Sequence, residues 1–162
     1  MSETLTIVNL SLDADLVAQD GPLAAMQAAL VSRLEAEDHY TGVSLLYENR
    51  LDILAEIELA IAQIGIAVVI MTPAIDDESP NIPRPILDAV TIIAQVTENP
   101  VINRAATGLR IPGGTIAWRV ATDLACTSLE GALLIHKSMR QVIDEDNGTL
   151  VWNVTFQHSL NI

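Results

Sequence analysis

The sequence is poor in cysteine, in aromatic residues and in positive charge. Its single cysteine, Cys126, excludes an internal disulfide framework and a cysteine-rich zinc site. Aromatic residues make up only 3% of the chain, which disfavours platforms that stack on bases or sugars. Eight Lys and Arg against 21 Asp and Glu give a net charge of −13. We therefore expect no specific nucleic-acid binding and no membrane partner, since both favour basic surfaces.

Targeting signals are also missing from the sequence pattern. The opening residues, MSETLTIVNLSLDADL, carry acids and no basic region of the kind that begins a signal peptide. The longest apolar stretch, residues 64–71, is far shorter than a membrane span. These features predict a soluble protein that is made inside the cell.

Half of the chain is apolar, which is typical of a globular protein rather than a disordered one. The length suits one domain, and no repeat or linker composition divides it, so we expect a single domain over residues 1–162. The first twenty residues show no sustained period and are expected to form a loosely ordered lead-in.

Helical periodicity appears in three segments. Residues 23–38 follow Gly21-Pro22 and end among acids, so this helix should fray near Asp38. Residues 49–64 carry isoleucines on one face, with Asn49 as the predicted N-cap and Gly65 as the stop. A third helix is predicted over residues 115–129, with Thr115 as its N-cap.

Strand patterns alternate with these helices. Residues 66–72 read as a central strand, and residues 86–97 as an interior strand covered on both faces. Residues 72–85 and 103–114 are predicted to be loops. Asn147-Gly148 is a strong hairpin signal, and the strand after it should turn Trp152, Val154 and Phe156 inward. The predicted class is α+β, with a mostly antiparallel sheet, helices packed on it and a C-terminal β-hairpin.

Two motifs are similar in part to known binding loops. Residues 108–115 match the phosphate-binding pattern except that Gly114 stands in place of the essential lysine, so a nucleotide site is not predicted. Residues 144–148 suggest a calcium loop, but the register then places Ile143 and Val154 where carboxylates are required. Neither loop supports a cofactor.

No other residues form a catalytic or metal-binding pattern. His39, His136 and His158 are far apart and lack metal-ligand spacing, and His158 falls on the apolar face of the last strand. Cys126 lies among apolar residues with no paired base, which favours a core thiol over a nucleophile. We predict no catalytic, cofactor-binding or metal-binding residue. One acidic cluster leaves a bound cation open: Asp76, Asp77 and Glu78.

One stretch of the chain resembles a known family. Residues 64–73 (IGIAVVIMTP), a proline-rich loop and residues 92–104 (IIAQVTENPVINR) are similar to the tail terminator, or tail completion, family of small phage and prophage neck and tail proteins. The resemblance covers residues 49–131, while the lead-in and residues 110–113 do not match. The positions that carry it are Glu98, Asn99, Pro100, Val101, Ile102, Asn103, Arg104, Thr107 and Gly108.

The resemblance implies a structural protein and not an enzyme. Such a subunit assembles as a ring, usually a homohexamer, at the head-proximal end of the tail tube, where it ends tube polymerisation and joins the tail to the head. The implied partners are further copies of the chain, the tail tube protein and the head-connector protein, while DNA passes through the ring unbound. The implied location is the virion tail or neck, and the host cytoplasm during assembly.

Several basic and amide side chains are candidates for the assembly interface. Arg104 could pair with a carboxylate of a neighbouring subunit. Alternatively, Asn103 caps a turn and Arg104 pairs within its own chain. The candidate interface residues are Asn99, Asn103, Arg104, Arg110 and Arg84.

Two other functions remain open from the sequence. One is a small acidic ligand-binding or enzymatic domain with a pocket beneath the proline-rich loop. The other is a different structural tail component, such as a tube or baseplate protein with similar strands.

Overall fold

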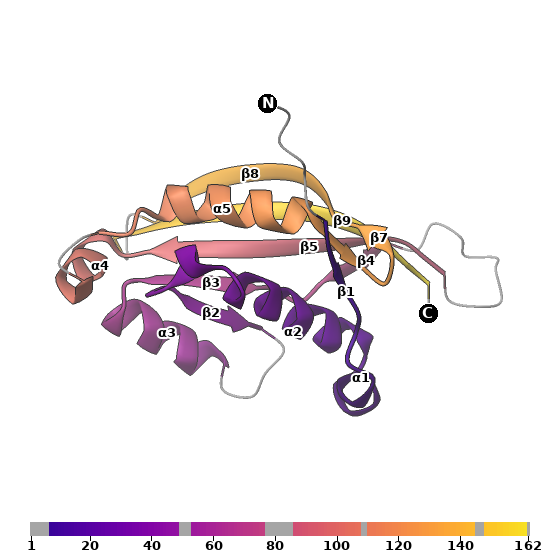
Figure 1. Cartoon of the computed structure of the whole chain (residues 1–162). Coiled ribbons are helices and arrows are strands. Elements are labelled where there is room, and N and C mark those ends of the chain that lie inside the picture. Colours follow the sequence, from indigo (N-terminus) through magenta and orange to yellow (C-terminus); the bar gives the residue numbers. More distant parts are fainter. Residues whose placement is uncertain (1–6, 49–52, 77–85, 108–109, 145–147, 162) are drawn as a thin grey trace.

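The computed structural model describes residues 7–48, 53–76, 86–107, 110–144 and 148–161 (Figure 1). The helices in these ranges are α1 (Ala14–Asp20), α2 (Pro22–Glu35), the short 3-10 helix η1 (Asp38–Tyr40), α3 (Ile53–Gln63), α4 (Pro100–Thr107) and α5 (Gly113–Ala125). The strands are β1 (Val8–Leu10), β2 (Ser44–Tyr47), β3 (Ile66–Ile70), β4 (Ala74–Asp76), β5 (Ile86–Glu98), β6 (Thr127–Leu129), β7 (Ala132–Leu133), β8 (Ile135–Asp144) and β9 (Thr149–Asn161).

The main sheet has the strand order β2-β3-β5-β9-β8, with β4 added alongside β5. Its β2–β3 pair is parallel and its other pairs are antiparallel. A smaller sheet joins β1, β6 and β7. This arrangement confirms the predicted α+β class with a mostly antiparallel sheet. The C-terminal hairpin is also confirmed, since β8 and β9 pair from Asp144↔Thr149 onward.

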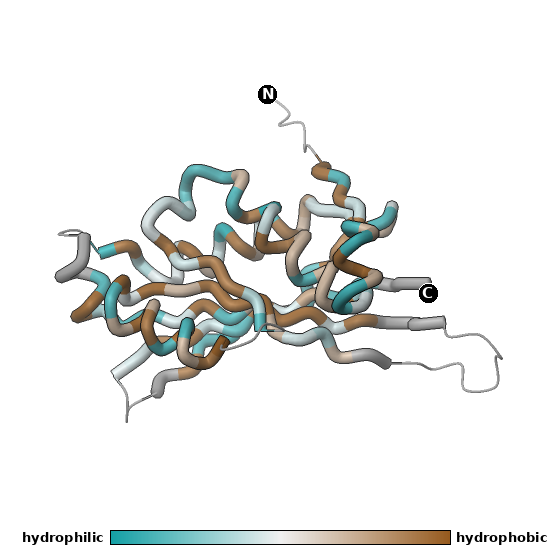
Figure 2. Tube along the Cα trace, turned by 90° about the horizontal axis from the view of Figure 1, so that it is seen from below, coloured by the Kyte–Doolittle hydropathy of each residue, from teal (hydrophilic) through white to brown (hydrophobic). Residues whose placement is uncertain are grey.

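Helices α2 and α5 cover one face of the main sheet, and the core lies between them and the strands. The inward residues of β9, Trp152, Val154 and Phe156, are 8%, 0% and 0% exposed, as their alternation predicted. Long hydrophobic stretches run along the strands in Figure 2. The other side chains of this core include Met26, Leu30, Leu34, Val68, Ile70, Val90, Ile92, Ala94, Val96, Ile116, Val120 and Leu124.

The opposite face of the sheet is covered only in part. The Ile-rich segment forms α3, as predicted, and α3 packs on β3 and β2. Residues Thr91, Ile93, Gln95 and Thr97 of β5 lie on this face and remain partly exposed. The expectation that β5 is covered on both faces is therefore wrong, because α3 does not extend across β5 and β9.

Several predicted boundaries were wrong. Residues 100–107 form α4, which overlaps the start of the loop predicted over residues 103–114. Residues 74–76 form β4 within the loop predicted over residues 72–85. Helix α5 begins at Gly113 rather than after Thr115, and its N-cap is Pro112. It ends at Ala125, so residues 127–129 belong to strand β6. Backbone pairing with β1 competes with helix formation there, because Val8–Leu10 align with Thr127–Leu129.

The N-terminal segment and helix α2 also differ from the sequence-based expectation. Residues 8–20 contain β1 and α1, although no sustained period predicted them. Helix α2 begins at Pro22 and ends at Glu35, shortly before the expected fraying at Asp38. The predicted cap Asn49 and the acids Asp77 and Glu78 lie outside the described residues.

Candidate functional site

A buried carboxylate lies at the end of β5. Glu98 follows Val96 on the inward face of the strand and is fully buried. Its Oε2 accepts hydrogen bonds from Arg110 Nε at 2.5 Å and from Asn103 Nδ2 at 2.8 Å. Its Oε1 accepts from an Arg110 terminal nitrogen at 2.7 Å and from the backbone N–H of Gly113 at 3.1 Å. Both carboxylate oxygens therefore have hydrogen-bond donors within the chain, and Arg110 binds the carboxylate in bidentate geometry.

Burial on its own would raise the pKa of the Glu98 carboxyl, because it disfavours the charged form. Hydrogen bonds from Arg110, Asn103 and Gly113, together with the charge of Arg110, outweigh this and hold the pKa below its usual range. The Gly113 N–H belongs to the first turn of α5, where the helix dipole favours an anion. Glu98 thus replaces the side-chain cap that Thr115 was expected to supply.

Asn103 connects helix α4 to the Glu98 carboxylate by a hydrogen bond. Besides its bond to Glu98, Asn103 donates to the carbonyl of Ile111 at 2.6 Å and accepts from the Ile111 N–H at 3.3 Å. Asn99 begins α4, because its side-chain oxygen accepts from the N–H of Ile102 at 3.4 Å. The segment Glu98–Asn103 therefore joins β5, α4 and the start of α5 into one hydrogen-bonded unit.

Two glycines allow these elements to approach closely. Gly65 has a φ of +85°, and a Cβ there would lie 2.2 Å from the backbone nitrogen of Asn103. A Cβ on Gly113 would lie 2.3 Å from the Trp152 ring and 3.0 Å from Glu98 Oε1. Neither position can accept a side chain without movement of its neighbours.

The structure brings together some of the candidate interface residues. Asn103 and Arg110 both bind Glu98. Asn99 lies at the start of α4, the helix that contains Asn103. Arg104 lies in α4, but its side chain is outside the described part of the chain, as is the whole of Arg84. Asn103 and Arg110 have partners within their own chain, so an additional contact with a neighbouring subunit stays a prediction.

Sequence reasoning did not identify Glu98 as the centre of this cluster. A usable signal was present, since Glu98 continues the alternation of Val90, Ile92 and Val96 into the core. A carboxylate at an inward strand position requires hydrogen-bond or ion-pair partners when it is buried. Asn103 and Arg110, which supply them, follow soon after Glu98 in the sequence.

An open groove of about 650 Å³ lies between α3 and the partly covered face of the sheet. Helix α3 contributes one acid and several apolar side chains, and β5 and β9 contribute amide, hydroxyl and apolar groups. The lining residues are Ile57, Glu58, Ile61, Ala62, Gln95, Thr97, Asn99, Thr149 and Val151. Across the floor of this face, Gln95 donates to Asn153 at 3.2 Å.

A second polar cluster joins η1 to α5. Asp123 Oδ2 lies 2.6 Å from His39 Nε2 and accepts a hydrogen bond from the Tyr40 hydroxyl at 2.7 Å. Burial, and then this hydrogen bond, raise the pKa of Tyr40 far above its usual range. The cluster ties the segment after α2 to α5, next to a shallow pocket of about 250 Å³.

The remaining histidines and the cysteine lie apart from this cluster. His158 is 2% exposed, and its Nε2 is 2.8 Å from the carbonyl of Leu129. Cys126 follows the last residue of α5 as its C-cap, not within the helix as predicted. Within the described ranges, no three His, Cys, Asp or Glu side chains gather as a metal site would require. No described helix has the length and apolar character to cross a membrane.

Comparison with solved structures shows a likeness in fold to a virion protein. No family model and no curated protein matches the sequence. A chain from the "Virion of native gene transfer agent (GTA) particle" superposes with a TM-score of 0.53 at 15% identity. The match covers 85% of this chain and 95% of that chain, so the two share a fold over nearly their whole length.

Proposed function

We propose that this chain is a structural subunit of a phage-like particle. The observation that carries the proposal is the fold shared with a chain of a gene transfer agent virion, which spans 95% of that chain. The likeness concerns a virion component, and the sequence resemblance independently concerns neck and tail proteins of phages. Two separate comparisons therefore favour the same class of protein.

Within that class, the chain acts as a tail terminator. It forms a homohexameric ring at the head-proximal end of the tail tube, ends tube polymerisation and presents a surface to the head connector. The residues that carry the family resemblance support this role, because Glu98, Asn99 and Asn103 organise α4 against β5. A protein with this role acts through its surfaces and needs no catalytic residue or cofactor.

Tube capping by the purified chain tests the proposal. Tail tube protein is polymerised with and without the chain, and tube lengths and ends are examined by negative-stain electron microscopy. We expect shorter tubes that carry a ring at one end, and light scattering of the chain should give the mass of a closed oligomer. Unchanged tube lengths, with no ring at either end, would contradict the terminator role.

A further inference from the structure

Helix α3 turns a largely apolar stripe toward solvent. Leu54 and Leu59 are 73% and 56% exposed, and Ala55, Glu58 and Ala62 beside them are also exposed. These positions are related by steps of three and four residues, so they form one continuous strip along the helix. An isolated surface helix normally presents charged residues there, and the strip is therefore suited to a contact with another protein surface. We call these five residues the α3 stripe.

Strands β2 and β8 form the two opposite edges of the main sheet (Figure 1). Helix α3 packs at the β2 edge, and β8 lies at the other. Strand β8 pairs with β9 on one side, and its other backbone edge has no partner strand among the described residues. Ile135 and Val142 are 57% and 53% exposed. Long edge strands of this kind are prone to pair or pack with another chain unless something blocks them.

The register of the hairpin places three β8 residues on the sheet face that α3 partly covers. Arg140 is opposite Asn153, and Val142 is opposite Val151. Asn153 and Val151 alternate with the inward residues of β9, so they and their partners on β8 lie on the outer face of the sheet. Ile135 is opposite Gln157 on the same face. Ile135, Arg140 and Val142 thus form an apolar strip with a cation within it, which we call the β8 patch.

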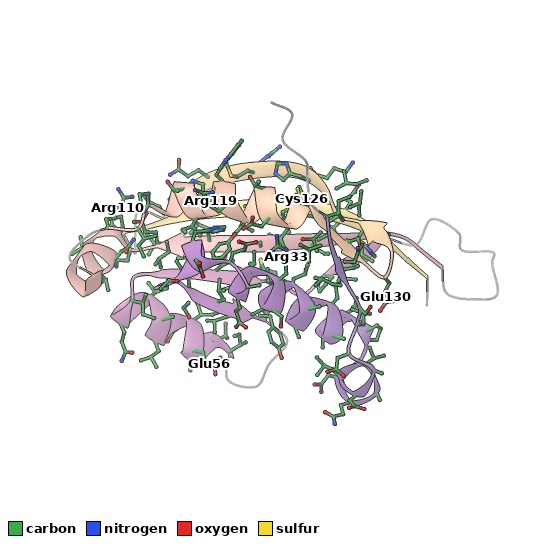
Figure 3. The ribbon with its side chains drawn as sticks, viewed as in Figure 1. Arg33, Glu56, Arg110, Arg119, Cys126 and Glu130 are labelled. Atoms are coloured by element: carbon green, nitrogen blue, oxygen red, sulfur yellow. The ribbon has the colours of Figure 1, made fainter. Side chains whose placement is uncertain are left out.

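The charges of the two surfaces are opposite. Helix α3 carries Glu56 and Glu58 and no basic residue, whereas residues 135–142 carry Lys137 and Arg140 and no acid. Figure 3 labels Glu56 on α3, and Arg119 on α5. Among the described residues, neither Glu58 nor Arg140 has an ion-pair partner. In a chain of net charge −13, this basic edge is a local exception.

We propose that copies of this chain join head to tail, with the β8 patch of one copy packed on the α3 stripe of the next. Arg140 then faces Glu58 of the neighbouring copy, and Ile135 and Val142 pack against Leu54 and Leu59. The two surfaces lie at opposite edges of one sheet. A repeated head-to-tail contact closes into a ring when its rotation divides a full turn, and continues as a filament when it does not. This inference rests on the proposed homo-oligomer and assigns its interface.

Charge reversal tests the pairing directly. In the Glu58→Lys variant two cations meet at each contact, and in the Arg140→Glu variant two carboxylates meet there. Each variant alone should associate about tenfold more weakly per contact, since an attraction is replaced by a repulsion. In a 1:1 mixture of the two variants, copies that alternate around the ring place a cation opposite a carboxylate at every contact, so the mixture should assemble. The double variant Glu58→Lys/Arg140→Glu tests the same pairing within one chain. It restores an opposite-charge pair at every contact and should regain the wild-type mass in light scattering.

Matched controls separate this effect from net charge. Asp20→Lys at the exposed end of α1 and Arg119→Glu on the exposed side of α5 change the net charge by the same amounts as the two single reversals. Both should assemble like the wild type. A folding defect cannot explain the expected result, because combining two substitutions that each damage folding would not restore assembly.

The outcomes distinguish this interface from the function on which it rests. If the wild type stays monomeric across a salt series, even with tail tubes present, the ring and its interface both fail. If the wild type forms rings and the two reversals assemble as well as the controls, the interface assignment alone is wrong. Single reversals that weaken assembly without recovery in the double variant would refute the head-to-tail pairing of Arg140 with Glu58.

Discussion

Replacing Arg110 by alanine removes the cation from the buried Glu98 carboxylate while its two other donors remain. Breaking a fully buried ion pair from one side costs about 3–5 kcal/mol, because a charge is left without compensation. Arg110 is 42% exposed, so the pair is partly screened and water can reach the vacated position. We therefore expect Arg110→Ala to lower the free energy of unfolding by about 2–3 kcal/mol near neutral pH.

The pH dependence of stability gives this prediction a second, independent readout. In the wild type the pKa of Glu98 is lower in the folded than in the unfolded state, so the unfolded chain binds more protons as the pH falls. The stabilisation is present above the unfolded pKa of about 4.5 and is lost as the pH falls through the folded pKa. Without Arg110, only the hydrogen bonds from Asn103 and Gly113 oppose the effect of burial, so the pKa of Glu98 is lowered less. Arg110→Ala should therefore lose less stability on acidification than the wild type.

Urea unfolding followed by circular dichroism, at several values between about pH 4 and pH 8, measures both effects. Arg119→Ala is the matched control, because Arg119 is exposed on α5. Glu98→Gln should remove most of the pH dependence that this site contributes. If Arg110→Ala unfolds within about 1 kcal/mol of the Arg119→Ala control at every pH, the reasoning about the buried carboxylate is refuted.

The remaining predictions concern packing, backbone geometry, a hydrogen bond and assembly. Phe156 is fully buried, so Phe156→Ala should cost about 3–5 kcal/mol in denaturant melts, and a loss below about 1 kcal/mol would contradict its core position. Gly65→Ala should cost at least about 2 kcal/mol, from its positive φ and the contact with Asn103; an unchanged unfolding midpoint would show that α4 can move aside. Tyr40→Phe should cost about 1 kcal/mol by removing the hydrogen bond to Asp123, and in the wild type no tyrosinate absorbance from Tyr40 should appear before alkaline unfolding. Light scattering should show larger oligomers as salt rises, because screening weakens the repulsion between copies of charge −13; a mass that falls with salt would contradict this.

The central strands and the hairpin could be predicted because their signals are local. The alternation in β9 and the apolar run in β3 both reflect burial, and the structure places them inside the sheet. The Ile-rich segment was correctly predicted as a helix because its acids do not alternate with a period of two. In each case the pattern of burial along the chain is enough to identify the element.

The missed elements depend on contacts between distant residues. Helix α5 starts at Gly113 because Glu98, fifteen positions earlier, accepts a hydrogen bond from the Gly113 N–H. No residue near Gly113 in the sequence indicates this contact. Strand β6 exists because β1 pairs with it from the other end of the sequence. Helix α1 is different, since Asp13 caps it with bonds to the N–H groups of Asp15 and Leu16, a local signal that sequence reasoning could have used.

The pairing of β5 with β9 also has a consequence for the rate of folding. The ladder runs from Ile86↔Asn161 to Glu98↔Leu150, so its partners are separated by about 50 to 75 residues along the chain. The β8–β9 hairpin closes a short loop and should form early, whereas β5 must wait until this longer segment is brought together. We expect folding in the millisecond-to-second range that is typical of domains rich in distant contacts, and docking of β5 on the preformed hairpin as its slow step.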